Sequence, residues 1–365
     1  MDFNENNQNI QEIQNNERYT LRISRGTPWV TYILMAINVM IWGFLTIQST
    51  FGTGESYDSL LMLYGMKDNF RILSGEYYRL VTPVFLHANL LHAAVNTYSL
   101  YSIGSIAERI FGHTKFFIIY MTAGIVGNIA SLMLSPNAGV GASGAIFGLM
   151  GALLYLGVEK PEVFKKYFGR SVITSVAINI AYGMSNPIID NYAHIGGLIG
   201  GFLASGAAGI GKAARITLKH IAKRTMYLVL TVAVAASGFV YAANCSMNRV
   251  VIAAQQLDDM FAARDWSGVE QLGEEIDGLY TKSENLSLRI LWNVTAAKVN
   301  LDKFNEALEY AERVREVSPE NGYYLLGVVY LNMGDGVAAR TALNSAKLAG
   351  YHDGEMIDRL LAEIE

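Results

Sequence analysis

Long apolar runs alternate with short polar connections along the first two thirds of the chain. The runs lie at residues 29–46, 81–103, 116–134, 143–158, 171–185, 192–210 and 225–243. Most of them approach the ~20 residues that an α-helix needs to cross the hydrocarbon of a bilayer, although the run that starts at residue 143 is short. The pattern predicts an all-α membrane domain of seven spans over residues 29–244.

The two ends of the chain have a different composition. Residues 1–28 begin with a tract rich in Asn, Gln and acidic side chains, which cannot bury enough apolar surface to offset the entropy of ordering. We expect a disordered tail there. After Asn244 the sequence becomes charged and helix-forming, which predicts a separate soluble domain over residues 245–365.

Small and aromatic residues in this last domain recur at the spacing of the tetratricopeptide repeat, in which small side chains let two antiparallel helices approach. The matching positions are Leu326, Gly327, Tyr330, Gly334, Ala339 and Ala346 in one unit, Phe304, Ala307, Ala311 and Pro319 in the unit before it, and Asp265, Trp266 and Val269 in a degraded third unit. Stacked repeats present a groove, which predicts a peptide or an adaptor protein as partner. A plain helical bundle without a ligand is the alternative.

The overall composition agrees with a membrane protein. Hydrophobic residues make up 52% of the chain and charged residues 16%, which is too apolar for an ordinary soluble protein. The net charge of −4 and the absence of a broad basic face argue against nucleic acid as a partner. With Cys245 as its one cysteine, the chain has no intramolecular disulfide and no multi-cysteine metal site. We expect no metal and no cofactor.

Lys and Arg are unevenly distributed among the connections. They gather before the first apolar run and after the second, fourth and sixth: Arg18, Arg22, Arg25, Arg109, Lys115, Lys160, Lys165, Lys166, Arg170, Lys212, Arg215, Lys219, Lys223 and Arg224. The opposite side of the predicted membrane domain has Lys67, Arg71 and Arg79. Because positive residues stay on the cytoplasmic side, this predicts a multi-pass protein of the cell membrane with a cytoplasmic N-terminus and an extracytoplasmic C-terminal domain.

Ser143 lies between glycines where an apolar helix is predicted to begin, in the stretch Gly141-Ala142-Ser143-Gly144. Backbone N–H groups at the start of a helix have no intrahelical partner, so they face any negative charge that forms beside the Ser143 Oγ. This arrangement suits a nucleophile. The alternative is that these small residues only pack membrane helices against one another.

The sixth apolar run opens with His194. The charge pattern places Ser143 and His194 at the outward ends of their spans, so the two residues can lie at one depth. Gly197 and Gly201 form a smooth ridge that lets this helix approach another closely. A serine and an imidazole within hydrogen-bonding distance would act as nucleophile and general base. A histidine that only fills the core is the alternative.

Three further polar residues accompany the second apolar run. His92 and Asn96 are four residues apart and share one helical face, whereas His87 lies off that face. Two ligating histidines at this spacing with a glutamate between them would indicate a zinc site, and that pattern is not present. The simplest alternative is that these side chains only hold helices together.

Four motifs together resemble the rhomboid intramembrane serine proteases. They are Gly141-Ala142-Ser143-Gly144, Ala193-His194 followed by Gly197 and Gly201, His87-x4-His92-x3-Asn96, and Gly104-x3-Glu108-x3-Gly112. The similarity covers residues 76–201 and implies a six-helix core, to which this chain adds one C-terminal span and the repeat domain. It does not explain the repeat domain.

The resemblance implies roles for individual residues. Ser143 would be the nucleophile and His194 its general base, and His92 and Asn96 would join the Ser143 N–H in the oxyanion hole. Supporting or structural positions are His87, Arg79, Glu108, Gly104, Gly112, Gly141, Phe147, Gly197 and Gly201. Phe147 replaces a tyrosine often found against the catalytic imidazole, and Tyr78 replaces a tryptophan before the loop arginine. Neither change removes a reacting group.

These patterns predict an endopeptidase that cleaves the transmembrane segments of single-pass proteins near the outer face of the lipid bilayer. The loop over residues 184–191 is interpreted as a mobile cap above the site, and Asp190 is given no role. One alternative is a catalytically silent scaffold of the same family, which has usually lost the catalytic residues that this chain keeps. A transporter would also fit seven spans with buried polar residues, but no acidic relay or repeated half is evident.

Overall fold

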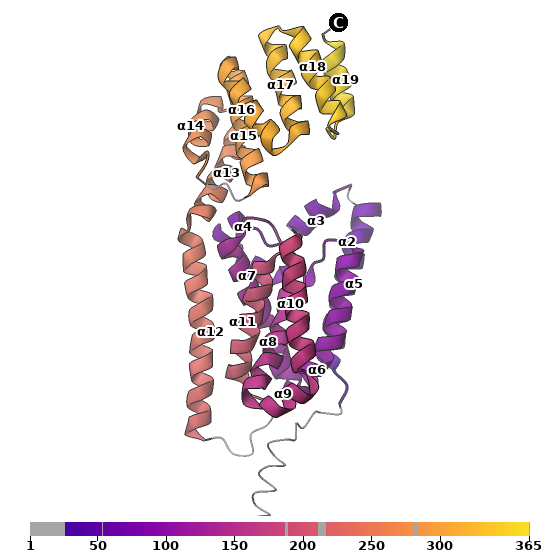
Figure 1. The fold of residues 1–365 in the computed structure, drawn as a ribbon, viewed down its shortest axis with the longest axis vertical. Helices are drawn as coiled ribbons and strands as arrows, with labels where there is room; N and C mark the ends of the chain where they lie inside the picture. Colours follow the sequence, from indigo (N-terminus) through magenta and orange to yellow (C-terminus); the bar gives the residue numbers. More distant parts are fainter. Residues whose placement is uncertain (1–25, 53, 187–188, 211–216, 280–282, 365) are drawn as a thin grey trace, which may run out of the picture. The chain divides into compact units, whose positions relative to one another are not determined.

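The computed structural model describes residues 26–52, 54–186, 189–210, 217–279 and 283–364. The predicted N-terminal tail lies outside these residues except for its last three positions. Contacts between Cα atoms divide the chain into two units, one up to Ala243 and the other from Asn244 onward. The regular elements of the described residues are helices (Figure 1), as the sequence predicts. An isolated antiparallel bridge pairs Lys67 with Gly139.

The first unit contains both long and short helices. They are α2 (Trp29–Phe51), α3 (Tyr57–Leu63), α4 (Asn69–Leu73), η1 (Tyr77–Leu80), η2 (Thr82–Phe85), α5 (Leu90–Ser99), η3 (Leu100–Gly104), α6 (Ser105–Phe111), α7 (His113–Leu134), α8 (Ser143–Glu159), α9 (Pro161–Tyr167), α10 (Gly169–Ser185), α11 (Asn191–Ala208) and α12 (Leu218–Asn244).

The helix expected over residues 81–103 is displaced towards the C-terminus. Residues 82–85 form a short 3₁₀ turn, and the helix begins only at Leu90, where the Asn89 side chain accepts a hydrogen bond of 2.9 Å from the His92 N–H. The helix then continues through the π turn η3 and α6 to Phe111. Pro83 lacks an N–H group, and an Asn cap favours a new helix start. His87 therefore lies in the loop before the helix.

Length and hydropathy alone single out α2, α7 and α12 as able to cross a membrane, within the part of the chain that the structure describes. The other four expected runs are shorter, interrupted or less apolar. The helix α8 is apolar but has 17 residues, and α11 has 18, with glycines and His194 in place of larger apolar side chains. Such helices depend on packing against neighbours, and α8 is buried along most of its length.

The centre of the first unit is a contact between α8 and α11, both of which also pack on α7. A Cβ atom on Gly197 would lie 2.0 Å from the Gly144 carbonyl oxygen, and one on Gly201 would lie 2.0 Å from that of Gly148. No side chain fits at either position, so the two backbones touch. This close approach brings the first turns of α8 and α11 beside one another.

The second unit consists of α13 (Ser246–Ala262), α14 (Trp266–Ile276), α15 (Glu284–Asn300), α16 (Phe304–Val317), α17 (Pro319–Met333), α18 (Gly336–Leu348) and α19 (Gly354–Ala362). Each helix packs mainly on its neighbours in sequence. Ala307, Ala311, Ala339 and Ala346 are fully buried at these contacts. These four alanines of the predicted repeat pattern therefore lie where adjacent helices meet.

Candidate active site

Ser143 and His194 meet at the first turns of α8 and α11. The His194 Nε2 lies 2.8 Å from the Ser143 Oγ, within hydrogen-bonding distance, although 51 positions separate the two residues in the chain. The His194 residue is 8% exposed. Ser143 is the first residue of α8, so its backbone N–H belongs to the set that lacks an intrahelical acceptor. The pair has the geometry of a hydroxyl beside its proton acceptor, with free donors at the same helix start.

The Phe147 ring covers one face of the His194 imidazole. The two ring centroids are 4.3 Å apart and the planes differ by 8°, a stacked arrangement. Phe147 lies one helical turn after Ser143 on α8, so a single helix supplies both the hydroxyl and the surface against which the imidazole packs. Stacking of this kind restricts rotation of the imidazole and keeps its Nε2 directed at Ser143.

His92 approaches the same place from the start of α5. A Cβ atom on Gly141 would lie 2.8 Å from the His92 Nε2 and 3.7 Å from the Ser143 Oγ, so Gly141 separates the two side chains. Gly141 also has φ +132°, a conformation that other residues rarely adopt. The Ala88 N–H donates a long hydrogen bond of 3.4 Å to the His92 Nδ1. That bond favours the tautomer whose Nε2–H is a donor on the Ser143 side.

Asn96 and His87 are buried but do not contact Ser143. The Asn96 amide donates a 2.9 Å hydrogen bond to the His92 carbonyl oxygen, back into its own helix. A donor role towards Ser143 requires that this amide turns. His87 lies edge-to-face with His92, with ring centroids 5.3 Å apart, and its two nitrogens have no hydrogen-bond partner among the described residues.

Glu108 caps a helix that is distant in sequence. Its carboxylate accepts hydrogen bonds from the Val30 N–H at 2.9 Å, the Thr31 N–H at 2.7 Å and the Thr31 hydroxyl at 2.6 Å. Pro28 precedes α2 and offers no capping side chain, so Glu108 satisfies the donors at that helix start. Gly104 packs against Thr31, and Gly112, with φ +82°, ends α6. These contacts join α2 to α6.

Arg79 organises the segment between α3 and η1. Its guanidinium is buried and donates to the Met62 carbonyl at 2.8 Å, the Met66 carbonyl at 2.9 Å and the Glu76 carboxylate at 2.6 Å. Hydrogen bonds from Tyr78 and Arg79 lower the pKa of Glu76 below its usual value, so Glu76 stays charged at neutral pH. Tyr78 itself is exposed. Arg79 thus supports a loop and does not contact the serine or the imidazole.

Sequence reasoning missed Asp190. This residue is the N-cap of α11, and its Oδ1 accepts a 3.0 Å hydrogen bond from the Ala193 N–H, next to His194. An aspartate directly before an apolar helix is a capping signal that could have identified it. The predicted cap loop over residues 184–191 includes residues 187 and 188, which lie outside the described residues.

A cluster of three carboxylates in the second unit is occupied by a lysine. Glu270, Glu274 and Glu306 have oxygens close enough to hold a metal ion. The buried Lys298 ammonium donates to all three, at 2.8, 2.6 and 2.6 Å respectively. This site is therefore an internal ion-pair network.

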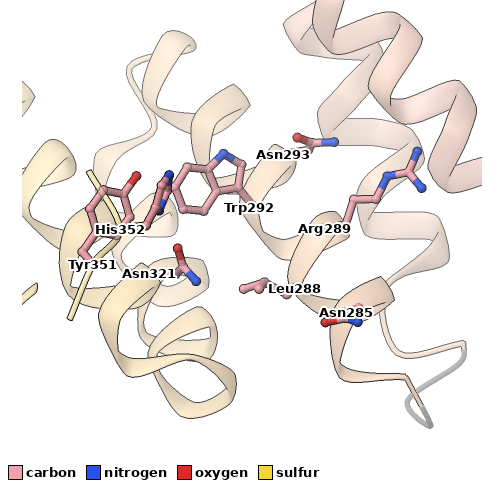
Figure 2. Close-up of a pocket in the computed structure, with 8 residues that line it drawn as sticks. All are labelled: Asn285, Leu288, Arg289, Trp292, Asn293, Asn321, Tyr351 and His352. Atoms are coloured by element: carbon pink, nitrogen blue, oxygen red, sulfur yellow. The ribbon is translucent and has the colours of Figure 1, made fainter. Parts of the chain in front are cut away.

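The second unit also contains an open cavity of about 530 Å³ on α15, α17 and the segment before α19 (Figure 2). Its lining residues are Asn285, Leu288, Arg289, Trp292, Asn293, Asn321, Tyr351 and His352. Trp292, Tyr324 and Tyr351 stack in a row, with interplanar angles of 3° and 5°. The Asp258 carboxylate accepts hydrogen bonds from Arg289 and Asn293, which neutralises the arginine. The charge of the lining Arg289 is thus paired, and most of the other lining groups are amides and aromatic rings.

Comparisons with known proteins agree with the geometry of the first unit. A family model described as the Rhomboid domain matches residues 74–210, the segment that carries Ser143, His194 and His92. The rhomboid protein YdcA of Bacillus subtilis is 33% identical over 180 residues, which cover 49% of this chain and 87% of YdcA. The chain belongs to the rhomboid family.

Rhomboid protease GluP of Bacillus subtilis is 33% identical over 307 residues. This similarity covers 84% of the chain, so it extends beyond the rhomboid domain, but the chain spans only 58% of GluP. The mitochondrial RHOMBOID-like protein 6 of Arabidopsis thaliana is 38% identical over 148 residues, which cover 40% of this chain and 48% of that protein. Family membership and the apolar helices together identify this rhomboid as a membrane protein.

Proposed function

We propose that the chain is an intramembrane serine endopeptidase whose catalytic dyad is Ser143 and His194. The observation that carries this proposal is the 2.8 Å approach of the His194 Nε2 to the Ser143 Oγ at the start of an apolar helix. Membership of the rhomboid family and similarity to a rhomboid protease support the same reaction class. A carboxylate as a third catalytic group in contact with the imidazole is not needed, because the stacked Phe147 ring already orients the imidazole.

The proposed reaction follows the acid–base chemistry of serine hydrolases. The Ser143 Oγ attacks the carbonyl carbon of the scissile amide while the His194 Nε2 takes the hydroxyl proton. The electron pair of the carbonyl bond moves to its oxygen. When the tetrahedral intermediate collapses, the C–N bond breaks and His194 returns the proton to the leaving amine. Water then attacks the acyl ester with the same base, which releases the acid and restores Ser143.

Donors near Ser143 would stabilise the oxyanion. The Ser143 N–H and the His92 Nε2–H face the space beside the hydroxyl, and Asn96 can join them if its amide turns from the His92 carbonyl. Each donor of this kind is worth about 3 kcal/mol in the transition state. The proposed substrates are transmembrane segments of single-pass proteins with small, helix-destabilising residues near the outer interface. An intact helix hydrogen-bonds and shields its amides, so the segment must unwind before cleavage.

The test is cleavage of a model single-pass substrate in liposomes by the wild type, Ser143→Ala and His194→Ala. Both variants should lose cleavage, and a fluorophosphonate probe should label the wild type but not Ser143→Ala. Ser102→Ala is the matched control, because Ser102 only donates to the Tyr98 carbonyl of its own helix. Undiminished cleavage by Ser143→Ala or His194→Ala would reject the dyad. Substrate binding without cleavage by the wild type would instead indicate a silent scaffold.

For the second unit we propose a tetratricopeptide-like domain that binds an extended, uncharged peptide segment of a substrate or an adaptor. The cavity in Figure 2 supports this ligand class, because amide side chains pair with peptide N–H and C=O groups and the stacked rings offer a flat apolar surface. By the distribution of Lys and Arg, this domain is extracytoplasmic and the N-terminus cytoplasmic.

Membrane proteomics of cells that express the wild type, Ser143→Ala or Trp292→Ala tests this second proposal. Substrates recruited through the cavity should accumulate uncut with Trp292→Ala as well as with Ser143→Ala, whereas a minimal transmembrane substrate should be cut normally by Trp292→Ala. Unchanged processing of every substrate by Trp292→Ala contradicts the proposal. Protease accessibility of the C-terminal domain in right-side-out vesicles tests the orientation.

A further inference from the structure

Asp190 connects the helix that carries His194 to two other parts of the first unit. Its Oδ1 accepts from the Ala193 N–H at 3.0 Å, and its backbone carbonyl accepts from the His194 N–H at 3.2 Å. Its second oxygen, Oδ2, accepts from the Ser131 hydroxyl on α7. One aspartate therefore holds the backbone at His194 and the residue before it, and fixes that turn against a neighbouring helix.

A buried lysine lies close to the same carboxylate. Lys67 is 1% exposed, and its ammonium donates to the Ser135 carbonyl at 3.1 Å and to the Asn137 carbonyl at 2.9 Å. A Cβ atom on Gly139 would lie 3.8 Å from the Lys67 Cδ and 3.9 Å from the Asp190 Oδ2, so both side chains reach the neighbourhood of Gly139. Burial lowers the pKa of Lys67 to about 8, and attraction to Asp190 opposes this shift.

Among the residues that the structure describes, no carboxylate forms a hydrogen bond or an ion pair with the His194 imidazole. Its Nδ1 has no hydrogen-bond partner among the described residues, while its Nε2 faces Ser143. Asp190 carries its negative charge at the same first turn of α11, four residues before His194, and its backbone carbonyl accepts from the His194 N–H. Asp190 is therefore the source of negative charge for the imidazolium that forms when His194 takes the serine proton.

We propose that Asp190 is the positioning residue of the dyad: it anchors the first turn of α11 to Ser131 on α7 and stabilises the His194 imidazolium through space. This inference rests on the proposed protease function. The cap and the charge can be separated, because Asn caps a helix about as well as Asp but carries no charge. If Asp190 were only a cap, Asp190→Asn would behave as the wild type.

The experiment compares kcat, KM and the midpoint of thermal unfolding for the wild type, Asp190→Asn and Asp190→Ala with the single-pass substrate in liposomes. Asp190→Asn should lower kcat about tenfold, with KM and the unfolding midpoint unchanged. Its amide oxygen still accepts from the Ala193 N–H, and its NH₂ group can donate to the Ser131 hydroxyl, so the negative charge is what the substitution removes. Asp190→Ala should lower both kcat and the unfolding midpoint. Asp265→Asn is the matched control, because Asp265 caps α14 in the same way, through a 3.0 Å bond from the Gly268 N–H, and should change nothing.

A wild-type kcat for Asp190→Asn overturns the inference. The rate of Ser143 labelling by a fluorophosphonate, measured on the same variants, separates this failure from a failure of the proposed function. If the wild type is labelled at Ser143, labelling of Asp190→Asn at the same rate refutes the role of Asp190 even without a substrate. If Ser143→Ala changes neither labelling nor cleavage, the proposed dyad is rejected, and the proposed role of Asp190 is rejected with it.

Discussion

At the scale of single residues, the site depends on short contacts that orient polar groups. Phe147 and Gly141 illustrate two ways in which a residue without a reacting group orients the polar groups of the site. Phe147 supplies a flat surface for His194, and Gly141 leaves room for His92 beside Ser143. Such residues are expected to affect the rate of the reaction more than the stability of the fold.

Phe147 offers a direct test of imidazole orientation. Phe147→Ala should lower kcat about fivefold, because an aromatic stacking contact is worth about 1 kcal/mol and the imidazole then rotates more freely. Phe147→Tyr keeps the ring and should retain kcat within about twofold of the wild type. Steady-state kinetics with the liposome substrate measure both. Equal kcat values for Phe147→Ala and Phe147→Tyr would show that stacking plays no part.

His92 and Asn96 differ in their present geometry, and this difference is testable. His92→Ala should lower kcat about a hundredfold, because it removes a donor beside the Ser143 Oγ. Asn96→Ala should lower kcat less, since its amide must first leave the His92 carbonyl. Labelling with a fluorophosphonate checks that Ser143 stays reactive in both variants. A larger loss of kcat for Asn96→Ala than for His92→Ala contradicts this order.

At the scale of helices, α8 and α11 meet through backbone instead of side chains. The glycine positions on both helices determine how far apart Ser143 and His194 lie, because one added Cβ at Gly197 or Gly201 would overlap a carbonyl oxygen. The capping residues Asn89, Glu108 and Asp190 then determine where α5, α2 and α11 begin. Helix starts and helix spacing together place the polar groups of the site.

Gly201→Val should separate α8 from α11 and thereby impair both folding and activity. Its Cβ would lie 2.0 Å from the Gly148 carbonyl oxygen, and overpacking of this kind typically costs 1–3 kcal/mol or more. We expect a lower unfolding midpoint and loss of Ser143 labelling. Gly43→Ala is the matched control, because a Cβ at Gly43 in α2 meets nothing within 4 Å. An unchanged midpoint for Gly201→Val would show that the helices can shift without penalty.

At the scale of the whole molecule, the chain has two units, each with its own buried polar contacts. In the second unit, burial alone would lower the pKa of Lys298, but the hydrogen bonds that Lys298 donates to Glu270, Glu274 and Glu306 raise it above the usual value. Burial alone would raise the pKa of Glu270, but bonds from Lys298 and Lys303 lower it. The network therefore links helices α14, α15 and α16.

The signs of these shifts predict how the stability of the second unit depends on pH. The contribution of Glu270 to the stability of the second unit is present above its unfolded pKa of about 4.3. This contribution is lost as the pH falls through the lowered pKa of Glu270 in the folded state. The contribution of Lys298 is complete below about 10.4 and is lost as the pH rises through its raised folded value. Protection of the α14–α16 amides from hydrogen exchange, measured relative to the intrinsic exchange rate at each pH, should therefore be greatest at intermediate pH.

Lys298→Met tests this network in the full chain. It should accelerate amide exchange in α14–α16 at pH 7, because it leaves three carboxylates without their shared cation. It should also reduce the loss of protection from exchange that acid causes in the wild type. Labelling of Ser143 serves as the control and should not change. Exchange at the wild-type rate in α14–α16 would contradict a stabilising role for the network.

The sequence alone was sufficient for the all-helical class, the membrane assignment and the rhomboid resemblance, which the family match confirms. Apolar runs and spaced motifs are local properties of the chain, so they can be read without coordinates. The start of α5 was predicted wrongly, because hydropathy does not register how Pro83 and Asn89 redirect the backbone. The sequence indicated that Ser143 and His194 could share a depth but not that they touch.

Tertiary structure decided the contacts between residues that are distant in the chain. The 2.8 Å approach of His194 to Ser143 requires that glycines on α8 and α11 bring two backbones together, and no single helix contains that information. The same holds for Asp190, whose carboxylate joins α11 to Ser131 on α7. Hydrogen bonds and van der Waals contacts act over a few ångströms in space, so only the folded chain determines which polar groups form the site.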